Sequence, residues 1–65
     1  MNNNIRTLRE TQNLTQQDLA DQLGVSRQTI ISLENGRYNP SIMLAYRISK
    51  IFNLSIEEVF LFEEE

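Results

Sequence analysis

Apolar residues recur every three or four positions over two short, adjacent segments in the first half of the chain. Leu19, Ala20 and Leu23 share one face of a helix predicted at about residues 16–23. Ile30 and Leu33 share one face of a second helix, predicted at about residues 27–35. Each helix therefore has one face for a core and one for solvent, and the turn between them must be short.

The residues around these two helices predict where each one begins and ends. Thr15 precedes the first helix and Asp18 stands three residues later, which is a variant of the capping box. Gly24 falls where a helix end needs a residue that tolerates positive φ. Ser26 can cap the next helix. The pattern predicts a helix-turn-helix, whose second helix can enter the major groove of DNA.

The rest of the pattern predicts three further helices. One covers about residues 4–12. Asn39 and Pro40 predict the start of another, with Asn39 as its N-cap and Pro40 at the first helical position, where the missing N–H costs nothing. Ser55 and Glu58 form a capping box for a short final helix. The 65-residue chain is therefore predicted to be one all-α domain of five helices, with room for a short extended segment at its C-terminal end.

Polar side chains dominate the outward face of the second predicted helix of the pair. Gln28 suits adenine N6 and N7, and Arg27 suits guanine or a phosphate. The alternative interpretation is that these are ordinary solvated residues of a surface helix. Ile31 can meet a thymine methyl or be a lone exposed isoleucine. The outward face comprises Arg27, Gln28, Ile31, Ser32 and Asn35.

Phosphate contacts are predicted on both sides of that helix. Gln16 stands at a helix N-terminus, where free N–H groups favour an anion, although it can also be a plain first-turn residue. The cation, hydroxyl and amide groups that follow the helix suit a second phosphate contact, with Tyr38 alternatively covering the edge of the core. With Asn35, which also lies on the helix face, the predicted contacts here are Gln16, Ser26, Arg37, Tyr38 and Asn39.

Two charged residues are predicted to face the interior. Glu34 lies near the core side of its helix, and Arg9 shares the inner face of the first helix with Ile5 and Leu8. A partly buried Arg9–Glu34 ion pair would tie the two helices together. The alternative is two independent surface charges.

The net charge of −3 is unevenly distributed along the chain. Residues 1–50 hold all six cationic side chains against four acidic ones, whereas residues 51–65 hold five glutamates and no cation. An acidic tail that points away from DNA costs little, because the Debye length is about 8 Å at physiological salt. Since few cations are available to displace counterions, we expect modest non-specific affinity for DNA.

Several function classes are excluded by composition. The chain has no cysteine and no histidine, which removes disulfides, zinc knuckles and the commonest general base. Glu57 and Glu58 are adjacent on a short helix and do not face each other, so we predict no enzyme. No cofactor, metal or small-molecule ligand is indicated. The chain shows neither a signal peptide nor an apolar run long enough for a membrane span, so we expect a cytoplasmic protein.

The stretch LTQQDLADQLGVSRQTIISLENGRYNPS resembles the helix-turn-helix of the phage lambda/434 repressor, Cro and XRE family. The resemblance covers about residues 5–56 and implies a five-helix DNA-binding domain. It implies base contacts by Arg27, Gln28 and Ser32, phosphate contacts by Gln16, Asn35 and Arg37, and the Arg9–Glu34 pair. Its short length and acidic ending look closest to small stand-alone members. The chain departs from the family pattern at Ile31, where many members are polar, and in its acidic balance.

The resemblance and the pattern together predict a sequence-specific regulator of transcription, a repressor, that binds double-stranded DNA as a homodimer. One recognition helix reads too few base pairs for useful specificity, whereas a two-fold dimer reads two half-sites. The predicted dimer surface is Ile56, Phe60, Leu61 and Phe62. Residues 60–62 can pair as strands across the two-fold axis, or Phe60 and Phe62 can fold back onto their own core. The alternative function is an antitoxin or protein-interaction module that binds DNA only secondarily.

Overall fold

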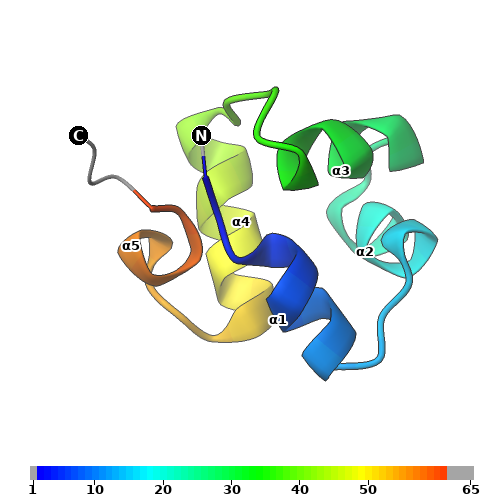
Figure 1. Ribbon diagram of the computed structural model, residues 1–65, viewed down its shortest axis with the longest axis horizontal. Coiled ribbons are helices and arrows are strands. Elements are labelled where there is room, and N and C mark those ends of the chain that lie inside the picture. The colour runs from blue at the N-terminus through cyan, green and yellow to red at the C-terminus, as the bar shows by residue number, and fades with distance from the viewer. Residues whose placement is uncertain (1, 62–65) are drawn as a thin grey trace.

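Five α-helices form the secondary structure of residues 2–61, the part of the chain that the computed structural model describes (Figure 1). The all-α prediction is confirmed, with no strand in this part of the chain. The helices are α1 (Ile5–Thr11), α2 (Gln16–Leu23), α3 (Arg27–Glu34), α4 (Ile42–Phe52) and α5 (Ile56–Val59).

α4, the longest of these helices, runs through the middle of the domain (Figure 1). α2 and α3 lie on one side of it and α5 on the other. Each of the five helices contributes to a common core, so burial of apolar surface joins the two halves of the chain. The largest side chains that are less than 2% exposed are Ile5, Leu19, Leu23, Ile30, Leu33, Ile48, Val59 and Phe60.

The predicted caps around the helix-turn-helix are confirmed. The Thr15 hydroxyl accepts from the Asp18 backbone N–H at 2.9 Å, and the Thr15 backbone N–H donates to the Asp18 carboxylate at 2.9 Å. The Ser26 hydroxyl accepts from the Thr29 backbone N–H at 3.2 Å. Gly24 ends α2 with φ of 70°, in the left-handed region that glycine reaches without strain. These local contacts fix where α2 ends and where α3 begins.

The predicted start of α4 is wrong by two residues. Asn39 is not its N-cap and Pro40 is not in the helix; Ser41 is the N-cap, and its hydroxyl accepts from the Leu44 backbone N–H at 3.1 Å. Ser41 supplies a good capping group one turn before the first buried residue. The residues before it are used instead to carry the chain from the end of α3 to the start of α4 (Figure 1).

Phe60 is placed in the core rather than on a dimer surface, which corrects that part of the prediction. Its side chain is 1% exposed. The extended segment at its position forms an antiparallel bridge with Asn3 of the same chain. The Asn4 N–H donates to the Val59 carbonyl at 2.8 Å, and the Leu61 N–H donates to the Asn2 carbonyl at 2.8 Å. The extended segment predicted at this end of the chain is therefore paired with residues 2–4 of the same chain.

The other predicted dimer residues have mixed positions. Ile56 is half-buried and packs against the core, and Leu61 is half-buried. Phe62 lies outside the described residues. Of the predicted dimer residues that the structure describes, none is fully exposed.

Replacing Phe60 with alanine should lower the free energy of unfolding by about 3–5 kcal/mol, because it removes a buried aromatic ring and leaves a cavity. Leu61→Ala is the matched control, since its side chain is only half-buried, and should cost much less. Urea denaturation followed by circular dichroism measures both. Unchanged stability in Phe60→Ala, combined with loss of self-association, would instead restore Phe60 to an interface.

Candidate nucleic-acid interface

α3 is held against α2 by its buried face and by the turn between them. Ile30 and Leu33 are 0% exposed, as is Leu19 of α2. Within the turn, the Val25 backbone N–H donates to the Ala20 carbonyl at 3.0 Å. Since the core-facing positions of both helices are buried, α3 is fixed in its rotation about its own axis and presents one defined face to solvent.

The first turn of α3 is the most exposed part of that face. Arg27 and Gln28 are exposed, whereas Ile31 and Ser32 are half-buried. Asn35, at the C-cap, is exposed. In helix-turn-helix proteins the first residues of the second helix are those that contact base edges. Arg27 and Gln28 therefore have the position and the freedom to read bases.

Gln16 contacts the C-terminal end of α3 and shares an open hollow with Arg27 at its start. Its side chain is half-buried, and its amide Nε2 donates to the Glu34 carboxylate Oε1 at 3.2 Å. Gln16 and Arg27 line the same open hollow, of about 700 Å³. The structure thus brings together a predicted phosphate contact and a predicted base reader. The other residues around this hollow are Arg9, Glu10, Asn13, Leu14, Thr15 and Gln17.

Arg9 and Glu34 form the predicted ion pair. Arg9 Nε lies 2.6 Å from Glu34 Oε2, Arg9 Nη2 lies 3.3 Å from Glu34 Oε1, and the two side chains are 10% and 5% exposed. Arg9 Nη1 also donates to the Leu14 carbonyl at 2.8 Å. The hydrogen bond to Glu34 raises the pKa of Arg9 above its ordinary value. The pair fastens α1, the α1–α2 loop and the end of α3 together, and through Glu34 it reaches Gln16 as well.

The residues that follow α3 stay on the surface. Gly36 has φ of 73°, and the Arg37 backbone N–H donates to the Ser32 carbonyl at 3.0 Å, which closes the helix. Arg37 and Asn39 are exposed, and Tyr38 is 44% exposed. The Ser26 hydroxyl, in contrast, is already used by the α3 cap and by Thr29 Oγ1 at 3.0 Å.

Two contacts that support this surface have no counterpart in the sequence prediction. Asn3 Nδ2 donates to the Leu33 carbonyl at 2.8 Å, so the N-terminal segment holds the last turn of α3. The Gln16–Glu34 hydrogen bond is the other. The run Asn2–Asn3–Asn4 is a weak signal for the first, because asparagine amides satisfy carbonyls at helix ends. Nothing in the local pattern signals the second.

Comparison with known proteins gives one family over most of the chain. A model of the family described as Helix-turn-helix matches residues 5–59. An uncharacterised HTH-type transcriptional regulator of Methanocaldococcus jannaschii is 51% identical over 65 residues, which is 100% of this chain and 98% of that protein.

Two longer relatives carry names that state a direction of control. The competence pilus inhibition repressor of Acinetobacter baylyi is 45% identical over 62 residues, which is 92% of this chain and 54% of the repressor. The HTH-type transcriptional activator BcrR of Enterococcus faecalis is 41% identical over 63 residues, which is 97% of this chain and 31% of the activator. Separately, none of the helices within residues 2–61 combines the length and the apolar character that crossing a membrane requires.

Removing one partner of the buried ion pair should be far more costly than removing one partner of an exposed pair. Glu34→Ala leaves the Arg9 charge buried without a counter-ion and should lower the free energy of unfolding by about 3–5 kcal/mol. The control is Glu10→Ala, which breaks the Arg6–Glu10 pair, 3.3 Å long with side chains 73% and 57% exposed, and should cost at most about 1 kcal/mol. Similar losses in urea denaturation of the two variants would contradict the structural role of the buried pair.

The capping box of α2 should make the stability of the folded state depend on pH in the acid range. The Thr15 backbone N–H lowers the pKa of Asp18 below its ordinary value of 3.8. The ionised form therefore stabilises the folded state above pH 3.8, and this contribution is lost as the pH falls through the lower pKa of the folded protein. Asp18→Asn should lower the melting temperature at neutral pH, and the difference from wild type should shrink over that acid range.

Proposed function

The chain belongs to the helix-turn-helix family of DNA-binding transcriptional regulators, and from that premise we propose that it is a repressor that binds a two-fold symmetric operator as a homodimer. It acts in the cytoplasm on double-stranded DNA. The observation that carries the proposal is the exposed first turn of α3, held at a fixed rotation by its buried face and its caps.

Base reading falls to a few side chains of α3. Gln28 is exposed and can pair bidentately with adenine N6 and N7, and Arg27 can do the same with guanine O6 and N7. Ser32 reaches the edge of the same face. Ile31 is half-buried, and the remainder of its side chain suits the methyl group of thymine.

Phosphate contacts on either side of α3 set its register on the duplex. Gln16, at the start of α2, contacts a phosphate of one DNA strand. The segment after α3 contacts a phosphate of the other strand, and its candidate residues are all exposed: Asn35, Arg37, Tyr38 and Asn39. Glu34 holds the Gln16 amide by one N–H, which leaves a second N–H and the backbone amide for a phosphate. Ser26 contributes through the N-terminus that it caps.

Specific binding needs a second copy of the reading helix. Few cations lie on this surface, so non-specific attraction is weak and the base contacts must provide most of the discrimination. Two half-sites read at once multiply the specificity of a single helix. A dimer that covers an operator within a promoter excludes RNA polymerase by occupancy alone, which is the physical basis for proposing repression. Of the longer relatives, the repressor is matched over a larger share of its length than the activator.

In vitro selection of DNA from a random pool should yield a two-fold symmetric motif. On that motif, Gln28→Ala should cost about 1–3 kcal/mol of binding free energy, while binding to random DNA should hardly change. Gln22→Ala is the matched control, because Gln22 is an exposed glutamine of α2 that lies outside the hollow lined by Gln16 and Arg27. Fluorescence anisotropy titrations at one fixed salt concentration measure both variants. Equal losses on selected and random DNA would show that Gln28 does not read bases.

A further inference from the structure

The outer face of α4 exposes an unusual amount of apolar surface. Ile42 is 75% exposed, Met43 64% and Tyr46 50%. Among the described residues, the exposed large apolar side chains are these three and Tyr38, which belongs to the proposed DNA surface. Scattered exposed apolar residues need no explanation, but three neighbours on one helix form a patch, and patches mark interaction sites.

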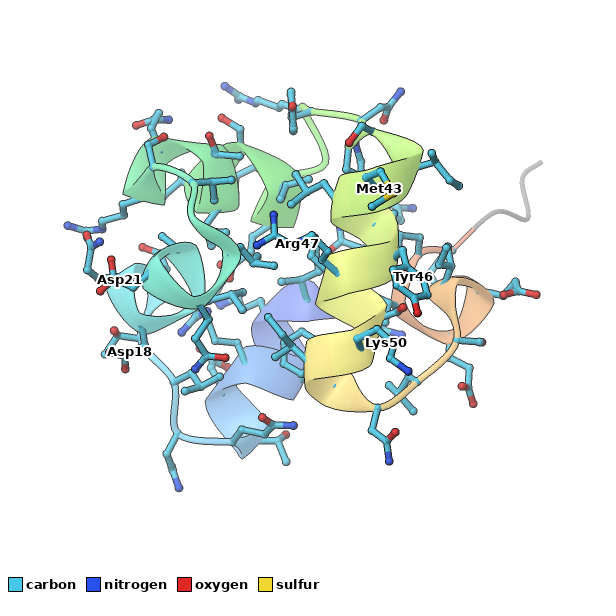
Figure 2. All side chains as sticks on the ribbon, turned by 180° about the vertical axis from the view of Figure 1, so that it is seen from behind. Asp18, Asp21, Met43, Tyr46, Arg47 and Lys50 are labelled. Atoms are coloured by element: carbon cyan, nitrogen blue, oxygen red, sulfur yellow. The ribbon has the colours of Figure 1, made fainter. Side chains whose placement is uncertain are left out.

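The pattern of α4 separates this patch from the core. Leu44, Ile48 and Phe52 are spaced four residues apart and are buried. Ile42, Tyr46 and Lys50 have the same spacing on another face, and Met43 lies beside them. Figure 2 shows Met43, Tyr46 and Lys50 following one another along α4, well apart from Asp18 and Asp21 on α2. We name Ile42, Met43, Tyr46 and Lys50 the α4 face.

We propose that the α4 face is the homodimer interface, with the α4 face of a second copy packed against it across a two-fold axis. This inference rests on the proposed function, which requires two copies, and it moves the contact away from Phe60. A two-fold contact places the same patch on both partners, so an apolar strip along a straight helix can cover itself.

The charges around the α4 face suit a second copy of this chain. The sequence has no acidic residue from position 35 to position 56, and α4 carries Arg47 and Lys50, both exposed. α5 carries Glu57 and Glu58, also exposed. Lys50 Nζ lies 5.8 Å from the centroid of the Tyr46 ring, so the cation sits at the edge of the apolar strip. Cations on α4 of one copy can therefore meet carboxylates on α5 of the other around an apolar centre, which is the usual anatomy of an interface.

The position of the α4 face also suits two-fold reading of DNA. The domain measures 31 × 22 × 20 Å, so two copies in contact have their centres separated by a distance of that order. Half-sites one helical turn apart are about 34 Å from centre to centre. The α4 face shares no residue with the outward face of α3, so contact along α4 leaves both reading helices uncovered. Contact through α2 or α3 would instead bring the reading helices together and cover them.

The patch is small, which bears on the strength of the dimer. Stable complexes bury about 1,200–2,000 Å² in total, and transient ones bury less. The accessible surface of one copy is 4202 Å², so a standard interface of about 800 Å² per partner would need far more of it than the four side chains of the α4 face. We therefore expect a weak dimer in solution that forms fully on DNA, where two half-sites hold both copies at a high effective concentration.

The test introduces a charge at the centre of the α4 face. Tyr46→Glu and Ile42→Glu should each abolish self-association in sedimentation equilibrium without changing the circular dichroism spectrum or the melting temperature appreciably. Gln22→Glu adds the same charge at an exposed position of α2 and is the matched control. On DNA with both half-sites of the selected motif, the two α4 variants should lose cooperative affinity by about 5- to 150-fold, the range of ordinary coupling energies. On DNA with one half-site they should bind like wild type.

A cysteine variant tests the same interface without relying on the folding of the Tyr46→Glu and Ile42→Glu variants. The chain has no cysteine, so a single cysteine introduced at position 46 or 43 reports on its own neighbours. Under mild oxidation Tyr46→Cys or Met43→Cys should form a covalent dimer that still binds the selected DNA, whereas Gln22→Cys should not form one.

The outcomes separate this inference from the proposed function. If wild type dimerises and the charged variants dimerise equally well, the α4 face is not the interface, and the proposed DNA reading stands. If wild type stays monomeric both in solution and on two half-sites, the homodimer and the α4 face are both overturned. If binding to single half-sites and to random DNA is the same for wild type and Gln28→Ala, base reading fails whatever the oligomeric state.

Discussion

A buried ion pair holds the reading unit of this domain to the rest of the chain. Taking the Arg9 and Glu34 charges out of water costs several kcal/mol per ion, and only close pairing with further hydrogen bonds compensates for it. Both conditions are met: two Arg9 nitrogens face Glu34, a third donates to the Leu14 carbonyl, and Gln16 shares the carboxylate. Because these partners come from α1, the α1–α2 loop, α2 and α3, the arrangement is satisfied only when all four are in place. The pair therefore contributes more to selecting one arrangement of the helices than to the net stability of the fold.

From this arrangement the two roles of α3 follow. Its inner face, Ile30 and Leu33, is buried with no freedom to rotate, so the outer face points in one direction. A helix anchored in this way presents Gln28 and Arg27 from a backbone that is already ordered, so on the proposed function only their side chains lose conformational freedom when they meet DNA. On the proposed function, the same anchoring would allow a chain of net charge −3 to bind DNA selectively, because discrimination would depend on the placement of a few side chains and not on a general positive field.

The parts of the fold that sequence reasoning predicted well are those fixed by contacts three or four residues apart. The Thr15–Asp18 and Ser55–Glu58 capping boxes are of this kind. The start of α4 was misplaced because Asn39–Pro40 and Ser41 are both good starting signals, and only the path of the chain between α3 and α4 decides between them. Phe60 was misplaced because the segment that pairs with it, residues 2–4, shows no sign of extended structure in its own sequence. The apolar surface of α4 was missed because Ile42, Met43 and Tyr46 stand beside core residues, and composition alone does not say which side of an apolar helix is covered.

The pairing of the two chain ends has a consequence for how the protein is made. Asn4 bonds to Val59, Asn2 bonds to Leu61, and Asn3 also holds the last turn of α3. The first and last residues of the core are thus neighbours in space but nearly the full length of the chain apart in synthesis. A ribosome that has finished the helix-turn-helix has not yet released Phe60, which completes the core. The proposed DNA-reading surface consequently acquires its final support only after residues 59–61 have left the ribosome, so a copy that stops before them lacks that support.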